Sequence, residues 1–252
     1  IQEHMMNGKR IVITGTGTVN ALGNSVKETW EKASNGVSGI DRITNFDASH
    51  LQIDIAGEVK NFDYKEHFSE DTLKKAKRMD KFVHFAFAAA NQAISQSGLE
   101  VSKEAERIGM CVSSGMGGMQ AQHDNSAALA TKGARRVSPF YVPAAIGNIA
   151  AGLLSMEYGM KGPNLSLQTA CATSNHSLIS AFMIIQSGMA DVMIAGGSEA
   201  AVIELGVAGF ANMQALSTHF RETPQKASRP YDVDRDGFVI AEGAGVLVVE
   251  EY

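Results

Sequence analysis

The feature that most constrains the fold is an uncharged apolar segment in the second half of the chain. Residues 178–185 read Leu-Ile-Ser-Ala-Phe-Met-Ile-Ile, and the next charged residue is Asp191. A helix that is apolar nearly all round must be covered on every side. The segment is therefore predicted to be a buried central helix in a layered domain. Gly188 is suited to end it as a C′ glycine.

Cys171 lies where this helix is expected to begin. A short apolar strand, residues 165–167, and a turn of small residues precede it, so the thiol falls in the first helical turn. The positive end of the helix dipole favours the thiolate and raises its nucleophilicity. The same unpaired N–H groups could hold an oxyanion. Cys171 is the candidate nucleophile, and the alternative is a buried structural cysteine. A nucleophile at the tip of a buried helix would require a pocket or tunnel leading to it.

No histidine is recognisable as a partner for this thiol. His176 is five residues further on, about 140° round the helix, and is interpreted as a packing or hydrogen-bonding residue. His4 lies in the presumed tag, and five others have no recognisable spacing to Cys171: His50, His67, His84, His123 and His219.

Composition limits the compartment and the partners. The net charge of −5 over 252 residues argues against a nucleic-acid binder. The two cysteines, Cys111 and Cys171, have no metal-binding spacing, so we expect free thiols, a reducing compartment and no metal site. No secretory signal is visible, and the apolar runs are shorter than the ~20 residues of a membrane span. A cytoplasmic protein without membrane contact is predicted. Residues 1–5, ahead of Met6, are interpreted as a tag remnant.

Residues 10–20 resemble the start of a dinucleotide-binding unit. A buried strand, residues 10–15, runs into Gly15 and Gly17, but Asn20 stands where the fingerprint requires its third glycine. No apolar strand ending in an acidic residue follows. The glycines are attributed to backbone turning, and no cofactor is predicted.

The rest of the chain alternates between helical and extended patterns. This alternation predicts an α/β fold with a largely parallel sheet flanked by helices. The expected helices are residues 25–34, 81–97 (ended by Gly98) and 143–154; the expected strands are residues 108–113, 191–195 and 245–250; residues 41–61 and 210–230 are expected to be irregular, and residues 114–118 form a glycine-rich turn.

Basic residues gather at two places. Four cations lie between Lys74 and Arg78, and Arg135-Arg136 forms a second group. They constitute either a solvated face or a docking site for an acidic partner.

Five motifs together resemble the β-ketoacyl-[acyl-carrier-protein] synthases, in particular the type II elongating condensing enzymes. The resemblance spans residues 9–252, and its motifs are residues 115–118, 169–177, 195–199, 229–232 and 236–238. It implies a thiolase-like fold, in which two similar halves pack as α/β/α/β/α layers. Residues 6–252 resemble the N-terminal half alone, with the C-terminal half absent.

The resemblance also implies roles for individual residues. Cys171 matches the nucleophile that accepts the acyl chain as a thioester, and its N–H matches one oxyanion donor. Met116 and Phe210 match acyl-pocket positions, and Tyr141 matches one that reaches across the interface of a homodimer. The positions that meet the acidic acyl carrier protein correspond to Lys74, Lys77, Arg78, Arg135 and Arg136.

The implied reaction is fatty-acid chain elongation. An acyl group would transfer to Cys171, and decarboxylative Claisen condensation with malonyl-acyl-carrier protein would give 3-oxoacyl-carrier protein. The family's catalytic histidines lie in its second half, so this chain is expected to acylate itself slowly without condensing. The alternatives are a non-catalytic dimerisation and carrier-protein-binding module and, more weakly, a thiolase or thioester hydrolase.

Overall fold

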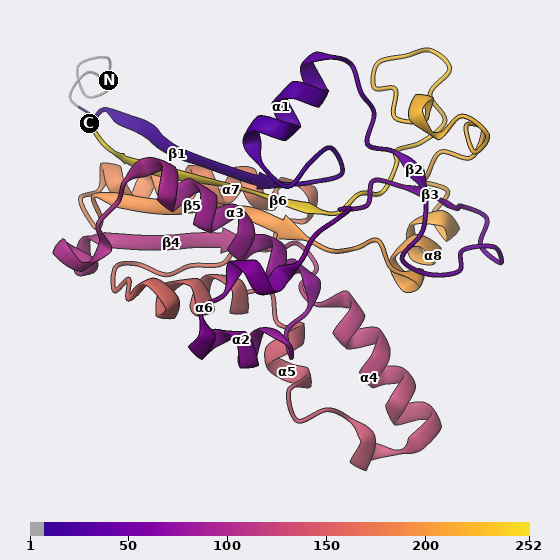
Figure 1. The fold of residues 1–252 in the computed structure, drawn as a ribbon, viewed down its shortest axis with the longest axis horizontal. Helices are drawn as coiled ribbons and strands as arrows, with labels where there is room; N and C mark the ends of the chain where they lie inside the picture. Colours follow the sequence, from indigo (N-terminus) through magenta and orange to yellow (C-terminus); the bar gives the residue numbers. More distant parts are fainter. Residues whose placement is uncertain (1–7) are drawn as a thin grey trace.

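The computed structural model describes residues 8–252, in which a four-stranded sheet lies between two layers of helices (Figure 1). The expectation for residues 1–5 falls outside this range. The strand order is β1-β6-β5-β4. The strands of the main sheet are β1 (Ile11–Val19), β4 (Ile108–Ser113), β5 (Val192–Glu199) and β6 (Gly243–Glu251).

The predicted α/β class is confirmed. β4 and β5 are parallel, and β6 is antiparallel to both of its neighbours, β5 and β1. Three of the four strands therefore point in one direction, and the last strand of the chain lies reversed between them. The predicted largely parallel sheet is therefore correct for the direction of the strands. Within residues 8–252, however, β4 and β5 are the only neighbouring strands of the main sheet that pair in parallel.

The helices cover the sheet and extend beyond it. The longer ones are α1 (Val26–Ser34), α3 (Lys81–Ser97), α4 (Met119–Lys132), α6 (Ile149–Tyr158), α7 (Thr173–Gln186) and α8 (Glu204–Asn212), and the shorter ones are α2 (Glu70–Ala76) and α5 (Tyr141–Ala145). The helix expected over residues 143–154 is two helices, α5 and α6, separated by Ile146, Gly147 and Asn148. A small second sheet pairs β2 (Asp41–Arg42) with β3 (Ile55–Ala56).

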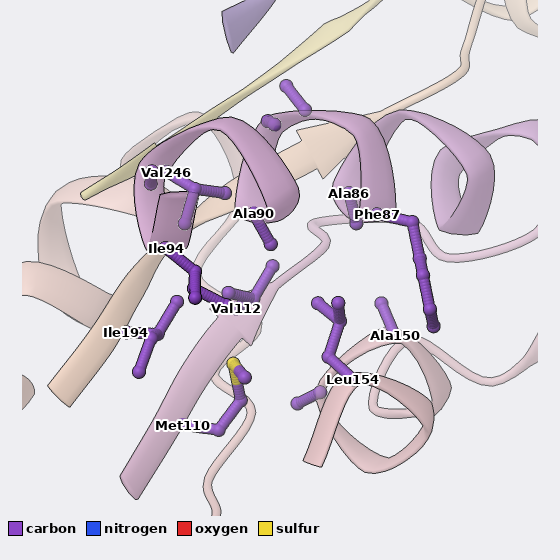
Figure 2. Close-up of a cluster of buried hydrophobic side chains, with 14 of the residues drawn as sticks. Ala86, Phe87, Ala90, Ile94, Met110, Val112, Ala150, Leu154, Ile194 and Val246 are labelled. Atoms are coloured by element: carbon purple, nitrogen blue, oxygen red, sulfur yellow. The ribbon is translucent and has the colours of Figure 1, made fainter. Parts of the chain in front are cut away.

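Alternation along the strands supplies two cores. Successive side chains of a strand point to opposite faces. On one face, Met110, Val112, Ile194 and Val246 pack against α3 and α6 (Figure 2). On the other, Cys111, Met193, Ala195 and Val249 pack against α7. Because helices cover both faces, the strands read as continuous apolar runs, which is why they were recognisable in the sequence.

The most buried helix is α3. All residues from Phe82 to Ala90 are buried, and Gly98 ends the helix in the left-handed conformation, as predicted. The helix lies against β1 where that strand carries Gly15 and Gly17. A Cβ at Gly15 would overlap the carbonyl oxygen of Ala93, and one at Gly17 that of Ala89. The turn expected at these glycines is therefore wrong: they lie inside a continuous strand and allow close approach of α3.

The expectation that residues 178–185 are covered on every side is also wrong for this chain. Ala181 and Ile185 of α7 are buried against the sheet. Its opposite side is open: Ile179, Phe182 and Met183 are 54%, 50% and 63% exposed. The described chain thus provides three layers, with one apolar helix face unburied.

The predicted strand at residues 165–167 is replaced by an irregular extended segment. Leu165 donates its N–H to Met110 of β4, but Leu167 donates to the side-chain oxygen of Ser113 instead of a backbone carbonyl. The segment follows the edge of β4 without forming a ladder.

Among the helices of residues 8–252, none combines the length and apolar character that crossing a bilayer requires.

Candidate active site

A cavity of about 650 Å³ opens at the edge of the sheet where β1, β4 and β5 end. Parallel strands bring their carboxyl ends to the same edge, and ligands of α/β folds bind there. Ser113 and Glu199, the last residues of β4 and β5, line this cavity, as does the start of β6. Sheet topology therefore places residues from four distant stretches of the sequence around one space.

Cys171 lines this cavity and is solvent-exposed. It lies in a single 3-10 turn, Ala170–Ala172, and α7 begins two residues later at Thr173, so the thiol precedes the helix that it was expected to open. No side chain caps the start of α7. The N–H of Thr173, the first residue of α7, donates to the carbonyl oxygen of Ala170, so the 3-10 turn and the helix are joined by a backbone hydrogen bond.

The turn before the thiol is conformationally unusual. Ala170 has φ of +53°, a left-handed conformation that costs energy for a residue with a side chain. Thr169 donates its N–H to the Thr173 hydroxyl, and the N–H of Ala172 donates to the carbonyl of Thr169. These bonds hold the turn and present the Cys171 side chain toward solvent.

The other cysteine has the opposite surroundings. Cys111 is fully buried within β4, and burial raises the pKa of its thiol. Hydrogen bonds from Ser177 and Ser113 oppose this shift without cancelling it. A neutral, inaccessible thiol is a poor nucleophile. Only Cys171 has the exposure that nucleophilic attack requires.

Two of the predicted acyl-pocket residues join Cys171 at the cavity. Met116, in the loop after β4, and Phe210, in α8, both line it. Phe238 packs edge-on against Phe210, with ring centroids 5.4 Å apart, and adds a second aromatic wall. The cavity is thus bounded by apolar side chains on the side away from the sheet edge.

Tyr141 lies elsewhere. It lines a separate space of about 270 Å³ with Lys77, Arg78 and Phe140. Within residues 8–252 it does not reach the Cys171 cavity, so its expected reach across a dimer interface stays a prediction.

The basic residues all lie on the surface. Lys74, Lys77 and Arg78 are exposed on and after α2, and Arg135 and Arg136 are exposed after α4. The guanidinium of Arg78 lies 3.9 Å from the centre of the Phe140 ring, which follows the second group in sequence. This cation–π contact links the two segments across 62 residues.

His176 behaves as expected for a hydrogen-bonding residue. Its Nδ1 lies 2.7 Å from the hydroxyl of Thr169, and the side chain is exposed. No histidine among the described residues lines the cavity. The same residues contain no cluster of three or more metal-ligating side chains.

Glu199 is a cavity residue to which the sequence analysis gave no role. Its carboxylate accepts hydrogen bonds from the Ser114 hydroxyl (3.0 Å) and the N–H groups of Gly115 (2.9 Å) and Met116 (3.2 Å). Burial raises the pKa of Glu199, and the nearby carboxylate of Asp80 contributes, although these hydrogen bonds oppose the shift. A charged residue at the end of a largely apolar strand was the available signal. Thr18, near the end of β1, and Asn20, just after it, also line the cavity and were missed.

The fold and this cavity are those of the β-ketoacyl synthase class of proteins. The family model "Beta-ketoacyl synthase, N-terminal domain" matches residues 8–252, and the chain belongs to this family. It is 45% identical over 247 residues to 3-oxoacyl-[acyl-carrier-protein] synthase 2 of Staphylococcus aureus (strain COL), covering 98% of this chain and 58% of that protein. The synthase 2 of Vibrio cholerae is 46% identical over 248 residues, covering 98% of this chain and 59% of that one.

Solved structures agree with this assignment. A ketosynthase bound to a hexaketide, in complex with its type II polyketide acyl-carrier protein, matches with a TM-score of 0.85 and 28% identity over 98% of this chain and 59% of its own. A β-ketoacyl synthase from Burkholderia phymatum matches with a TM-score of 0.84 and 27% identity over 97% of this chain and 59% of its own. The chain thus spans somewhat more than half the length of the relatives that it matches.

Proposed function

We propose that this chain carries the acyl-accepting half-reaction of a fatty-acid-elongating 3-oxoacyl-[acyl-carrier-protein] synthase. The observation that carries the proposal is the exposed thiol of Cys171, which precedes the uncapped start of α7 and opens into an apolar cavity of about 650 Å³. An apolar space beside a nucleophile suits an acyl chain. Relatives of about 45% identity are named for the whole reaction.

In the proposed step, the sulfur of Cys171 attacks the carbonyl carbon of an acyl thioester. The N–H of Cys171 and the positive end of the α7 dipole are suited to stabilise the oxyanion that develops. The bond to the carrier sulfur then breaks, the carrier leaves as a thiol with the proton from Cys171, and the acyl chain remains on Cys171. Met116, Phe210 and Phe238 would line its path.

The second half-reaction is assigned to the whole synthase. There, malonyl-carrier protein would lose carbon dioxide, and the resulting carbanion would attack the acyl group on Cys171. Because no histidine of residues 8–252 lines the cavity, this chain supplies no imidazole to stabilise the enolate. We therefore assign acylation, and not condensation, to these residues.

The proposed partner is an acyl carrier protein. One solved relative is a ketosynthase in complex with such a protein. The exposed cations Lys77 and Arg78, with Lys74, Arg135 and Arg136, would meet its acidic surface. The arm of α4 and α5, which projects from the body in Figure 1, carries Tyr141 and would form a homodimer contact. We also propose that the protein acts in the cytoplasm, where fatty-acid chain elongation would take place.

Acylation is tested by intact-mass analysis of the chain after incubation with octanoyl-acyl-carrier protein or a cerulenin-like electrophile. We expect one adduct that maps to Cys171, is absent from C171S and is retained in C111S. The physical reason is accessibility, because Cys111 is fully buried.

Two results would contradict the proposal. The first is equal or absent labelling of the two cysteines, which would favour the second candidate, a non-catalytic dimerisation and carrier-binding module. The observation that motivates this candidate is that no histidine of residues 8–252 lines the cavity. Release of 3-oxoacyl product by this chain alone would show that it condenses.

A further inference from the structure

Glu199 holds four of the five residues in the loop between β4 and α4, residues 114–118. Its Oε2 accepts the N–H groups of Gly115 and Met116, and its Oε1 accepts from the Ser114 hydroxyl. That hydroxyl oxygen in turn accepts the N–H of Gly117 at 2.8 Å. Every residue from 114 to 117 is therefore tied to one carboxyl group, directly or through Ser114.

The loop has little room to move where Glu199 holds it. A Cβ at Gly115 would lie 3.0 Å from Oε2 of Glu199 and 3.2 Å from the carbonyl oxygen of Ala170. The Gly115 backbone is thus packed between Glu199 and the residue before Cys171. Gly117 has φ of +68°, which turns the chain toward α4. Met116 sits between these two constrained glycines.

Placing a carboxyl group at this buried position costs free energy. Burial raises the pKa of Glu199, so holding its charged form in place costs free energy. A carboxyl oxygen accepts two N–H groups at once, which satisfies donors of an irregular loop that no strand or helix partners. One of the two N–H groups that Glu199 accepts belongs to Met116, whose position matches the acyl pocket.

We propose that Glu199 is a positioning residue: by holding residues 114–117 it fixes Met116 at the wall of the Cys171 cavity and so sets which acyl chains the thiol accepts. This inference rests on the proposed acyl acceptance. It assigns acyl selectivity to a residue at the end of β5 that acts through hydrogen bonds to the loop.

The test compares three single substitutions. E199D retracts the carboxylate by one methylene and breaks its bonds to the loop. E199Q keeps an amide oxygen for Gly115 and Met116 and presents an NH₂ donor to Ser114. The matched control is E58D, because the buried Glu58 likewise accepts two N–H groups and a hydroxyl, from Thr44 and Asn45, away from the loop.

The first measurement is amide hydrogen exchange, which needs no acylation. In E199D, the N–H groups of Gly115 and Met116 should exchange about tenfold faster, as expected for the loss of one hydrogen bond each. E199Q should restore nearly wild-type exchange in residues 114–117, and E58D should leave it unchanged. Unchanged exchange in E199D would overturn the inference.

The second measurement is the ratio of Cys171 acylation rates with hexanoyl- and tetradecanoyl-N-acetylcysteamine. E199D should change this ratio by about threefold or more, the size of effect that small changes in an apolar pocket produce. E199Q and E58D should keep the wild-type ratio, and in an M116A background E199D should change it no further. General destabilisation would slow both donors alike.

The outcomes separate this inference from the proposed function. A wild-type chain that accepts neither thioester would contradict acyl acceptance itself. A wild-type chain that is acylated, together with an E199D variant of unchanged ratio, would overturn only the role of Glu199.

Discussion

The carboxylate of Asp236 joins the two ends of the irregular segment between residues 217 and 236 through hydrogen bonds. It accepts hydrogen bonds from the Ser217 hydroxyl (2.6 Å) and the N–H groups of Thr218 (2.7 Å) and His219 (2.8 Å). Burial by itself would raise the pKa of Asp236, but these bonds outweigh it and lower the pKa from 3.8 to about 2. Phe238, two residues on, lines the Cys171 cavity, so the fold of this segment bears on the site.

The pKa of Asp236 predicts a dependence of stability on pH. Because the pKa of Asp236 is lower in the folded state, the carboxylate stabilises the folded protein at pH values above 3.8, its pKa in the unfolded chain. This stabilisation is lost as the pH falls through about 2, the pKa in the folded protein. At neutral pH it amounts to roughly 2 kcal/mol. D236N should therefore be less stable than wild type by about that amount at pH 7, and the difference should narrow from about pH 5 toward pH 3. Urea unfolding across this range measures it, and a difference independent of pH would refute it.

At the scale of elements, the contact between α3 and β1 depends on glycine. G17A would place a methyl group against the Ala89 carbonyl of α3, which cannot move without displacing the most buried helix. We expect a loss of about 2–3 kcal/mol of unfolding free energy, or failure to fold. G152A is the control: a Cβ there meets no atom within 4 Å, and it should stabilise α6 by about 0.5–1 kcal/mol. Thermal melts compare them, and equal stabilities would contradict the close-packing account.

Elements could be predicted where a pattern is local. The helix over residues 81–97 and the strand over residues 108–113 were predicted with the bounds that the structure shows. Gly15 and Gly17 were misread as a turn because the contacts that require them are to Ala93 and Ala89, in a helix far along the sequence. Residues 178–185 were expected to be covered on every side because the segment is apolar nearly all round. That composition shows which faces are apolar but not whether another element of this chain covers them.

The same limit applies to the site. Cys171 was recognisable from its neighbours in sequence, whereas Met116 and Phe210 were assigned by resemblance. Glu199 went unassigned because its hydrogen bonds reach a loop more than 80 residues earlier. Only the parallel pairing of β4 and β5 brings the two together.

On the scale of the whole molecule, the open side of α7 continues onto the sheet. Leu178 and Phe182 of α7 line a shallow groove with Ile11, Ile13 and Leu247 of β1 and β6. Ile13 is itself 58% exposed. A continuous exposed apolar face of this kind favours association.

We therefore expect the isolated chain to self-associate as its concentration rises. F182Q should reduce this association with little change in stability, because Phe182 is already half-exposed. W30Q is the control, since Trp30 is exposed on α1, outside the groove. Sedimentation velocity measures the outcome. Equal behaviour of F182Q and wild type would show that this face does not drive association.

The position of β6 has a consequence for the order in which the molecule folds. Within residues 8–252, β1 lies at the edge of the main sheet, and β6 is its only partner there. During synthesis, β1 therefore has no strand to pair with until residues 243–251, which form β6, have left the ribosome. Such distant pairing raises the contact order and slows folding. Until then, the nascent chain exposes β1 and the side of α3 that β1 later covers.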